Sequence, residues 1–543
     1  MDWAGTVAEL VRRRADDPRP GLVAGDRSWS WSQVVAEAAA RAGWYAEDRG
    51  RRGASGPPHV GVLLDNTPDY ALWLTAAALG RFVVVGLNAT RRADGLTEDV
   101  RATACDLVVT DAAGAALLDV ADLGPARVVD TAAASYPPCG LPVDDAEPGD
   151  LHVLVFTSGT TGSPKAVRCS QGKIAWSAQG LVMRTELTAD DVVYCAMPLF
   201  HSNAVIAGWG PALAVGATLA LPPPERPRFS ASGFLPDVRR YAATYANYVG
   251  TPLSYVLAQP AHEDDADNPL RLVFGNEGAP ADLGRFAERF GCRVVDGFGS
   301  SEGGISISRT PETPAGALGL PNGDVRVLDP ATGKACPEAL LDEAGRLTNP
   351  EAVGELVNCD GAGMFEGYWD APADDAHRLR DGRYWSGDLG YRTADGFLWF
   401  AGRSGDRLRV GGENFPAAPV ARLLGQHPSV VEVVVYAVPD PTAGDQVMAA
   451  VVPGDGFDPA GFASWAAAQP GCAAPWVPRF LRVLSEVPRT PTGKVLTRVL
   501  AQQRWDGEGV WLRDGRALEL RPMSDADRAV LATAFTDAGR PLL

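Results

Sequence analysis

Polar and glycine residues between positions 157 and 165 are the clearest candidates for chemistry in this chain. They follow residues 151–156, an apolar run that reads as a buried strand. Two glycines free backbone N–H groups there, and these donors can surround the oxygens of a polyphosphate together with the neighbouring hydroxyls. The spacing excludes a Walker loop, because only two residues separate the glycines and Lys165 precedes Ala166. We expect an ATP-binding loop made of Thr157, Ser158, Gly159, Thr160, Thr161, Gly162, Ser163, Pro164 and Lys165.

Composition limits the classes of partner. The 543 residues are enough for about two to four domains with apolar cores. A net charge of −18 argues against a protein that holds nucleic acid or an anionic membrane by general electrostatics. The eight cysteines include no Cys-x-x-Cys pair, which argues against a zinc site or a disulfide framework. Because residues 1–17 do not read as a secretory signal, we expect the cytoplasm.

Residues 204–223 carry no charge and are the one stretch that invites comparison with a membrane span. Glycine and proline interrupt the stretch at Gly208, Gly210, Pro211, Gly216 and Pro222. These residues break a continuous helix, so we expect a buried helix, turn and strand and no membrane span.

The order of apolar patterns predicts an α/β protein. Strand-like runs at 59–64, 82–87, 107–110, 153–156, 192–197, 218–221 and 272–274 alternate with alanine-rich helical stretches, which is typical of layered parallel sheets. After about residue 315, short strands with Gly and Asp turns predict a small antiparallel sheet. A small α+β domain is expected to follow, with strands at 430–437 and 448–452 and helices at 419–426 and 459–469.

With these patterns in place, the chain resembles the superfamily of adenylate-forming enzymes over nearly its whole length. That superfamily includes acyl-CoA synthetases, adenylation domains of peptide synthetases, and luciferase. Motifs occur in the family's order at residues 157–165, 198–201, 297–302, 384–389, 402–403, 411–414 and 491–494. The resemblance implies ATP, Mg²⁺ and coenzyme A as cofactors.

The resemblance implies roles for single residues. Glu302 follows a glycine-rich turn, where its carboxylate can hold Mg²⁺ on ATP, and Ser301 offers a hydroxyl to the phosphoryl group. Asp388 corresponds to the ligand of the ribose hydroxyls, and Arg403 is expected beside it at the nucleotide. Lys494 corresponds to the lysine that stabilises charge while the substrate carboxylate attacks the α-phosphate.

Further contacts to the cofactors follow from the same resemblance. Gly411 and Gly412 lie in the segment that the family presents to the pantetheine arm of coenzyme A. The remaining positions expected at the nucleotide are Gly278, Ala279, Pro280, Asp296, Gly297, Phe298 and Gly299.

The implied reaction has two steps at one site. The acid and ATP give acyl-AMP and pyrophosphate, and a thiol then displaces AMP. In the family a mobile C-terminal domain rotates between the steps and moves Lys494 away. We expect an N-terminal domain at 1–404, the mobile domain at 405–503, and a hinge at Gly405 and Asp406. The Gly-Asp pair at the hinge resembles very-long-chain acyl-CoA synthetases and fatty-acid transport proteins, and glycine tolerates a large change of backbone angles.

Residues 504–543 extend beyond the lysine loop. Residues 509–513 also resemble the long-chain branch of the family. We expect this tail to pack on the main body, and the sequence indicates no function for it.

The acid is expected to be hydrophobic, long-chain or polycyclic. Relatives that activate amino acids place an Asp after the second motif, whereas residues 200–204 contain His201 and no acid. The positions expected to line the acyl pocket are mostly small or apolar: His201, Val249, Gly250, Thr251, Gly275 and Gly278. His201 is a candidate gate or wall of the pocket, and a structural histidine is the alternative.

Three functions remain open on the sequence. The first is a complete acyl-CoA ligase. The second passes the acyl group to the phosphopantetheine of a carrier protein, or performs only one half-reaction. The third is a binding or transport-associated protein without the chemistry, against which Lys165, Glu302, Asp388, Arg403 and Lys494 argue. Primary lipid and secondary metabolism, including antibiotic biosynthesis, both remain open, and a homodimer is an alternative to a monomer.

Overall fold

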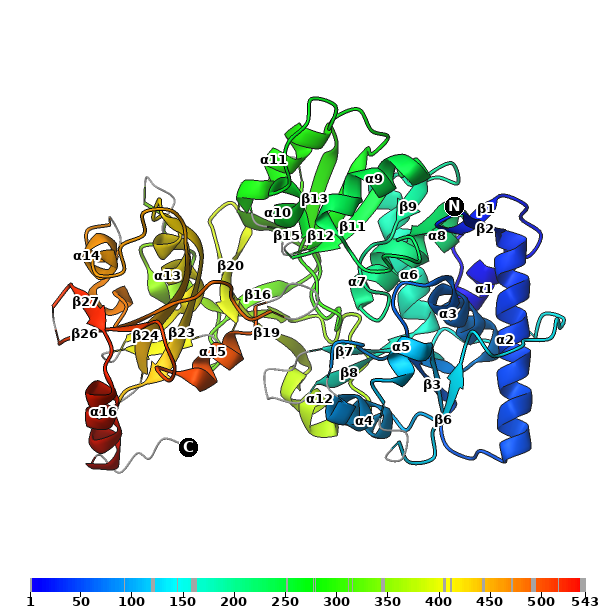
Figure 1. Ribbon diagram of the computed structural model, residues 1–543, viewed down its shortest axis with the longest axis horizontal. Helices are drawn as coiled ribbons and strands as arrows, with labels where there is room; N and C mark the ends of the chain where they lie inside the picture. Colours follow the sequence, from blue (N-terminus) through cyan, green and yellow to red (C-terminus); the bar gives the residue numbers. More distant parts are fainter. Residues whose placement is uncertain are drawn as a thin grey trace. The chain divides into compact units, whose positions relative to one another are not determined.

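The computed structural model divides into two compact units, which are described separately (Figure 1). The first unit comprises residues 1–306 and 362–380, and the second comprises residues 307–361 and 381–543. The structure describes residues 2–91, 93–118, 123–143, 145–157, 164–250, 252–276, 278, 280–310, 312–314, 316–342, 347–403, 407–410, 413–441, 445–469, 472–489, 495–515 and 517–537.

One sheet of the first unit has the strand order β13-β12-β11-β9-β10-β1-β2. Its strands run parallel except for the hairpin partner β2. Short runs of Val, Leu, Ala and Tyr form these strands, and helices cover the sheet, as the alternating pattern predicted. The strands are β1 (Pro20–Ala24), β2 (Arg27–Ser30), β9 (Val192–Tyr194), β10 (Thr218–Leu221), β11 (Tyr245–Val249), β12 (Leu272–Asn276) and β13 (Arg293–Gly297).

The other sheet of this unit has the order β6-β5-β3-β4-β7-β8. Only the pair β7 and β8 is antiparallel, and the predicted phosphate loop connects these two strands. The strands are β3 (His59–Leu63), β4 (Val83–Gly86), β5 (Leu107–Thr110), β6 (Arg127–Asp130), β7 (Leu151–Thr157) and β8 (Lys165–Ser170). The apolar run at 151–156 is therefore a strand, as predicted.

Most helices of the first unit bury apolar side chains, whereas α12 buries none. The longest of them in Figure 1 is α2, which begins at a capping box made by Ser30 and Gln33 and ends at Gly53. The helices are α1 (Val7–Arg12), α2 (Trp31–Arg52), α3 (Pro68–Gly80), α4 (Ala93–Ala102), α5 (Ala112–Ala115), α6 (Gln171–Thr185), α7 (Ser202–Ala204), α8 (Gly210–Val215), α9 (Ala231–Tyr241), α10 (Pro252–Leu257), α11 (Pro280–Phe290) and α12 (Pro372–Arg378).

The uncharged stretch at 204–223 forms a π-helical turn (Val205–Trp209), the helix α8 and the strand β10. This is the buried helix, turn and strand that the glycines and prolines predicted. No helix among the described residues combines the length and apolarity that crossing a membrane requires.

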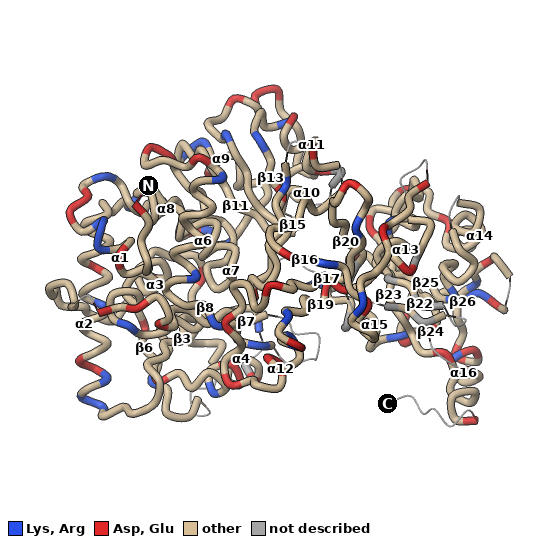
Figure 2. The backbone as a smooth tube through the Cα atoms, turned by 180° about the vertical axis from the view of Figure 1, so that it is seen from behind, with Lys and Arg blue, Asp and Glu red and all other residues tan. Residues whose placement is uncertain are grey.

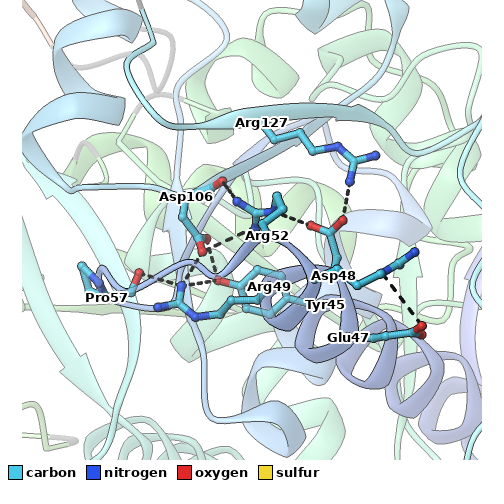
Figure 3. A network of polar contacts seen from close by, with 9 residues as sticks. Tyr45, Glu47, Asp48, Arg49, Arg52, Pro57, Asp106 and Arg127 are labelled. Atoms are coloured by element: carbon cyan, nitrogen blue, oxygen red, sulfur yellow. Dashed lines mark hydrogen bonds and ion pairs between the residues drawn. The ribbon is translucent and has the colours of Figure 1, made fainter.

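A network of ion pairs fastens α2 to the sheet that contains β5 and β6 (Figure 3). Asp48 of α2 pairs with Arg52 and Arg127, and Asp106 beside β5 pairs with Arg49. The Tyr45 hydroxyl also donates to Asp106 at 2.6 Å. Figure 2 shows acidic and basic residues close together along this helix. We assign the network a structural role, because its carboxylates are neutralised by its own arginines.

The second unit contains an antiparallel sheet in the order β14-β15-β20-β19-β17-β16. This confirms the antiparallel sheet expected after about residue 315. The strands are β14 (Ile307–Ser308), β15 (Ala317–Pro321), β16 (Val325–Leu328), β17 (Gly354–Asn358), β19 (Arg383–Arg392) and β20 (Leu398–Arg403).

A further sheet of the second unit has the order β23-β24-β25-β26-β27, and β21 pairs with β22. The predicted strands at 430–437 and 448–452 correspond to β23 (Val430–Pro439) and β24 (Asp445–Pro453). The predicted helices correspond to α13 (Ala417–Leu424) and α14 (Phe462–Ala467). The other elements are β21 (Arg407–Val410), β22 (Glu413–Pro416), β25 (Phe480–Val483), β26 (Val510–Arg513), β27 (Leu520–Pro522), α15 (Thr497–Gln503) and α16 (Asp525–Asp537).

The tail after residue 503 differs from the expectation. Its strands β26 and β27 extend the sheet of the second unit, where we expected a segment on the main body. Trp505 stacks between Phe480 and Phe535, with ring centroids 5.1 and 5.9 Å apart. The tail therefore completes the core of the small domain, because its apolar residues cover a sheet face that would otherwise be exposed.

The expected boundary at residue 404 stays a prediction. Gly405 and Asp406 lie outside the described residues, and the compact units separate at residues 306, 361 and 380. The small domain and the antiparallel sheet fall in the same unit.

Candidate active site

Three neighbouring strands of the first unit end together at the predicted nucleotide site. Their register places Tyr248 of β11, Gly275 of β12 and Asp296 of β13 side by side. Ligands of open parallel sheets bind beyond the carboxyl ends of the strands, and all three residues lie at these ends. The register thus joins predicted pocket and nucleotide positions that are far apart in the sequence.

Asp296 accepts hydrogen bonds from Tyr248 and Gly278. The Tyr248 hydroxyl donates to Asp296 Oδ2 at 2.6 Å, and the backbone N–H of Gly278 donates to the same oxygen at 2.8 Å. Gly275 allows the strands to approach, because a Cβ there would lie 2.3 Å from the carbonyl oxygen of Tyr248. One residue further along, the side-chain amide of Asn276 in β12 donates to the carbonyl of Gly297 in β13 at 2.8 Å.

The loop that follows β9 reaches the same strand ends. Asn203 donates to the carbonyl of Tyr248 at 3.2 Å and accepts from the Asn247 amide at 2.7 Å. His201 precedes α7, and its ring lies 4.5 Å from that of Phe200. Asn247 begins a stretch, residues 247–252, that the family resemblance placed at the acyl pocket, whereas Asn203 was not assigned to it. Amide groups therefore lie among the small and apolar residues expected here.

Glu302 lies in a turn that a buried lysine holds. Lys173 of α6 is 5 % exposed and donates to the carbonyls of Ser301 and Glu302 at 3.1 and 3.0 Å. The hydroxyls of Ser301 and Ser202 are 2.6 Å apart. Gly303 completes the turn with φ +72°, a left-handed conformation that glycine adopts without strain.

Glu302 is 7 % exposed, and its side chain accepts a hydrogen bond from Tyr368. The Tyr368 hydroxyl lies 3.0 Å from Glu302 Oε1 and 3.1 Å from Arg378 Nε. Burial, with the nearby Glu302 charge, holds the pKa of Tyr368 above its usual range, so the phenol remains a donor at neutral pH.

Lys165 begins β8 and lies directly opposite Thr157, the last residue of β7. Both ends of the predicted phosphate loop are therefore placed. The Lys165 ammonium pairs with Asp374 of α12 and lies 5.5 Å from the ring centroid of Tyr368. The Lys165 ammonium thus lies over the ring of the same tyrosine whose hydroxyl contacts Glu302.

Lys173, Tyr368 and Asp374 were missed by the sequence analysis. One signal was available for the lysine, because the chain has only four lysines among its 49 basic residues, at positions 165, 173, 334 and 494. Where arginine is used almost everywhere, a retained lysine indicates a site that needs a compact ammonium group.

The expected ribose ligand belongs to the second unit. Asp388 of β19 is 9 % exposed and lies opposite Arg403 of β20 in the antiparallel register. The Ser386 hydroxyl accepts from the Asp388 backbone N–H at 3.0 Å and donates to the carbonyl of Leu356 at 2.7 Å. The pairing of Asp388 and Arg403 agrees with a shared role, which remains a prediction.

The remaining expected positions are described in part or not at all. Val249 ends β11, Gly250 donates its N–H to the Asn276 carbonyl at 2.8 Å, and Phe298 and Gly299 follow β13. Pro280 begins α11. Outside the described residues lie Ser158, Gly159, Thr160, Thr161, Gly162, Thr251, Ala279, Gly405, Asp406, Gly411, Gly412 and Lys494.

The donor set suits a metal that arrives with the nucleotide. Within the described ranges, no group of three or more His, Cys, Asp or Glu side chains could hold an ion alone. Mg²⁺ is commonly held by one or two carboxylates together with substrate phosphates and water. A single buried carboxylate, Glu302, fits that arrangement.

Family models match most of the chain. A model described as AMP-binding enzyme matches residues 9–369, and one described as AMP-binding enzyme C-terminal domain matches residues 420–494.

Relatives named as CoA ligases or synthetases match nearly the full length. The medium/long-chain-fatty-acid–CoA ligase FadD17 of Mycobacterium marinum is 47 % identical, over 94 % of this chain and 99 % of the relative. The steroid-22-oyl-CoA synthetase of Rhodococcus jostii is 46 % identical, over 98 % of each chain.

Solved structures share the fold at lower identity. ATP-bound MatB from Rhodopseudomonas palustris is 23 % identical with a TM-score of 0.77, covering 92 % of this chain and 99 % of MatB. The anthranilate CoA ligase AuaEII in complex with anthranoyl-AMP is 22 % identical with a TM-score of 0.76, covering 92 % and 98 %.

Proposed function

This chain belongs to the family of AMP-binding enzymes and is an AMP-forming acid–CoA ligase, and we propose that its substrate is a hydrophobic carboxylic acid. The observation that carries the proposal is the full-length similarity to ligases named for medium/long-chain fatty acids and for a steroid acid. Both named substrates are large apolar acids, so the shared property is apolar bulk next to one carboxylate.

The loop after β9 supports an acid without an amino group. Residues 200–204 contain no carboxylate to pair with an ammonium. Asn203, in the short helix α7 at the end of this segment, is hydrogen-bonded to the Tyr248 carbonyl and the Asn247 amide. An amino acid would leave its charge without a counter-ion, which is costly in a partly buried site.

The proposed roles follow the two steps of the reaction. In the first, an oxygen of the substrate carboxylate attacks the α-phosphorus and pyrophosphate leaves. Lys165 and Thr157 bind phosphate oxygens, Asp388 and Arg403 bind the nucleoside, and Lys494 stabilises the developing charge. In the second, the thiolate of coenzyme A attacks the acyl carbonyl and AMP leaves.

Mg²⁺ completes the proposed site on Glu302. The ion neutralises charge on the phosphate oxygens of ATP when it is bound. Glu302 supplies the carboxylate, and Lys173 and Tyr368 hold the turn and the side chain that present it.

The test is a substrate panel with two readouts, pyrophosphate release and acyl-CoA formation. We expect decanoate, palmitate and a steroid side-chain acid to exceed malonate and phenylalanine by at least about 100-fold in kcat/KM, since apolar contacts supply the discrimination. Equal rates with malonate would contradict the proposal. The ranking of palmitate against the steroid acid decides between a long-chain and a polycyclic substrate.

The same two readouts, with supplied acyl-AMP and with a carrier protein in place of coenzyme A, identify the acceptor of the acyl group. An enzyme that releases no pyrophosphate with any acid and ATP, but turns over supplied acyl-AMP, would be an enzyme of one half-reaction. Transfer to a phosphopantetheinylated carrier protein, with none to coenzyme A, would show a carrier-specific ligase.

A further inference from the structure

Tyr368 contacts two charged side chains of the predicted ATP site in the first unit, Lys165 and Glu302. We propose that it is a positioning residue, whose hydroxyl holds the Glu302 carboxylate in the orientation that binds the metal on ATP. This inference rests on the proposed role of Glu302. Tyr368 belongs to no motif that the sequence analysis identified, and it lies 66 positions from Glu302.

The direction of the hydrogen bonds is determined by their chemistry. Arg378 can only donate, so the phenolic oxygen accepts from Arg378 Nε at 3.1 Å. The single phenolic hydrogen is then available to Glu302 Oε1, 3.0 Å away. Glu302 Oε1 therefore accepts this bond, which fixes the orientation of the carboxyl group.

Tyr368 is itself held rigidly. The residue is 4 % exposed, and its backbone N–H donates to Asp375 Oδ1 at 2.7 Å. An antiparallel bridge joins its backbone to Val167 of β8, the strand that Lys165 begins. The ring also packs on Phe365, with centroids 5.2 Å apart. A tyrosine held at both backbone and ring can orient a partner at little entropic cost.

The two ends of Glu302 are held by different residues. Lys173 binds its backbone carbonyl, and Tyr368 binds Oε1. In the described part of the chain, no residue bonds to Oε2, which is the oxygen left for the metal. Mg²⁺ demands nearly ideal octahedral geometry, so the direction of this oxygen affects affinity. Loss of a residue that orients a metal ligand commonly weakens metal binding about 10–100-fold.

The variant Tyr368→Phe isolates the hydroxyl. It keeps the ring that packs on Phe365 and lies 5.5 Å from the Lys165 ammonium. Tyr194→Phe is a matched control, because the Tyr194 hydroxyl also donates to a carboxylate, Asp237 Oδ2, at 2.6 Å. Asp237 is paired with Arg226 in turn, so the control loses a similar bond elsewhere in the unit.

The experiment measures metal binding without turnover. Mn²⁺ binding to the full-length enzyme saturated with α,β-methylene-ATP is followed by electron paramagnetic resonance. We expect Tyr368→Phe to weaken Mn²⁺ affinity at least about tenfold. The Mg²⁺ concentration for half-maximal pyrophosphate release should rise by a similar factor, while transfer from supplied acyl-AMP to coenzyme A stays at the wild-type rate.

Two variants separate failure of this inference from failure of the proposed function. If Glu302→Gln and Tyr368→Phe both leave Mn²⁺ affinity unchanged, Glu302 is not the metal ligand and the proposed function loses that role. If only Glu302→Gln weakens it, Tyr368 is a packing residue and the inference is overturned. The inference also fails if Tyr194→Phe weakens Mn²⁺ affinity as strongly. Should Tyr368→Phe not fold, Arg378→Gln removes the donor that directs the hydroxyl and must weaken Mn²⁺ affinity in the same assay.

Discussion

At the residue scale, the first unit uses lysine where an ammonium must meet several acceptors around one point. Lys173 Nζ donates to the carbonyls of Arg168, Ser301 and Glu302 at 3.4, 3.1 and 3.0 Å. A lysine has three donors that rotate about one atom, whereas the planar fork of arginine directs its donors into one plane. This explains why lysine persists at this position in a chain that otherwise uses arginine.

Lys494 is the residue whose loss separates the two half-reactions. We expect Lys494→Ala to raise the activation free energy of acyl-AMP formation by about 3–4 kcal/mol, because one stabiliser of the transition-state charge is lost. Transfer from supplied acyl-AMP to coenzyme A should remain near the wild-type rate. Pyrophosphate release and thioester formation, measured separately, provide the comparison. An equal loss in both steps would remove the assignment.

His152 makes stability depend on pH. It is fully buried in β7, stacks on Trp209 with centroids 6.0 Å apart, and neither ring nitrogen has a hydrogen-bond partner among the described residues. Burial lowers the pKa of His152 from 6.5 to about 3. Below pH 6.5 the unfolded chain binds a proton that the folded protein does not. The free energy of unfolding therefore decreases as the pH is lowered from 6.5 towards 3.

The variant His152→Leu tests this dependence. As the pH falls from 6.5 towards 3, the group should cost the wild-type protein about 1.4 kcal/mol per pH unit. Between pH 7 and pH 5 the melting temperature of His152→Leu should therefore fall by less than that of the wild type. Parallel curves of melting temperature against pH for the two proteins would refute the assignment.

At the scale of elements, the site depends on how closely β11, β12 and β13 approach one another. Their register aligns Tyr248, Gly275 and Asp296, and the Asp296 carboxylate joins Tyr248 to Gly278. The tail acts similarly in the second unit, where β26 and β27 extend a sheet and Trp505 covers it. Both arrangements depend on pairings between distant segments.

Gly275→Ala tests the approach of the strands. Its Cβ would lie 2.3 Å from the Tyr248 carbonyl oxygen, and the backbone of β11 would have to shift to relieve this clash. We therefore expect the free energy of unfolding to fall by about 3 kcal/mol. The KM for ATP should also rise, because Asp296 and Tyr248 would shift. Urea unfolding and initial rates are the measurements.

Gly284→Ala is the matched control on α11. A Cβ at Gly284 would meet nothing within 4 Å, and alanine favours the helix by about 0.5–1 kcal/mol. If Gly275→Ala were tolerated as well as this control, close strand packing would not explain the glycine.

At the scale of the whole molecule, one site must serve two steps with different requirements. The predicted hinge at Gly405 and Asp406 lets the domain that carries Lys494 turn between them. Glycine can adopt both backbone conformations, whereas proline holds φ near −65°. The rotation is a prediction from the family resemblance, and it explains why one catalytic lysine stands on a separate domain.

Gly405→Pro tests the hinge. We expect the variant to hold one domain orientation, so that one half-reaction persists and the other slows strongly. Acyl-AMP formation and transfer to coenzyme A are measured separately, with a thermal melt to exclude unfolding. A folded variant that performs both steps at wild-type rates would place the hinge elsewhere, with Asp406 the next candidate.

Much of the fold was predictable because local patterns carry it. The apolar run before Thr157 became β7, the interrupted stretch at 204–223 became a helix, turn and strand, and the later Gly and Asp turns marked antiparallel strands. The placement of the tail was not predictable, since its sequence shows apolar residues without showing which sheet they cover.

The amino-acid order alone determined the identity of the chemical groups, because each motif is a short run whose spacing can be read directly. Lys165 was identified from its loop in this way, and Glu302 and Asp388 from the resemblance of their motifs to those of the family. Their partners Tyr368 and Lys173 became visible only once the chain was folded. Tyr368 and Glu302 stand 66 positions apart, and Lys173 and Glu302 stand 129 apart. Hydrogen bonds over such separations depend on strand register and packing, which no local pattern encodes.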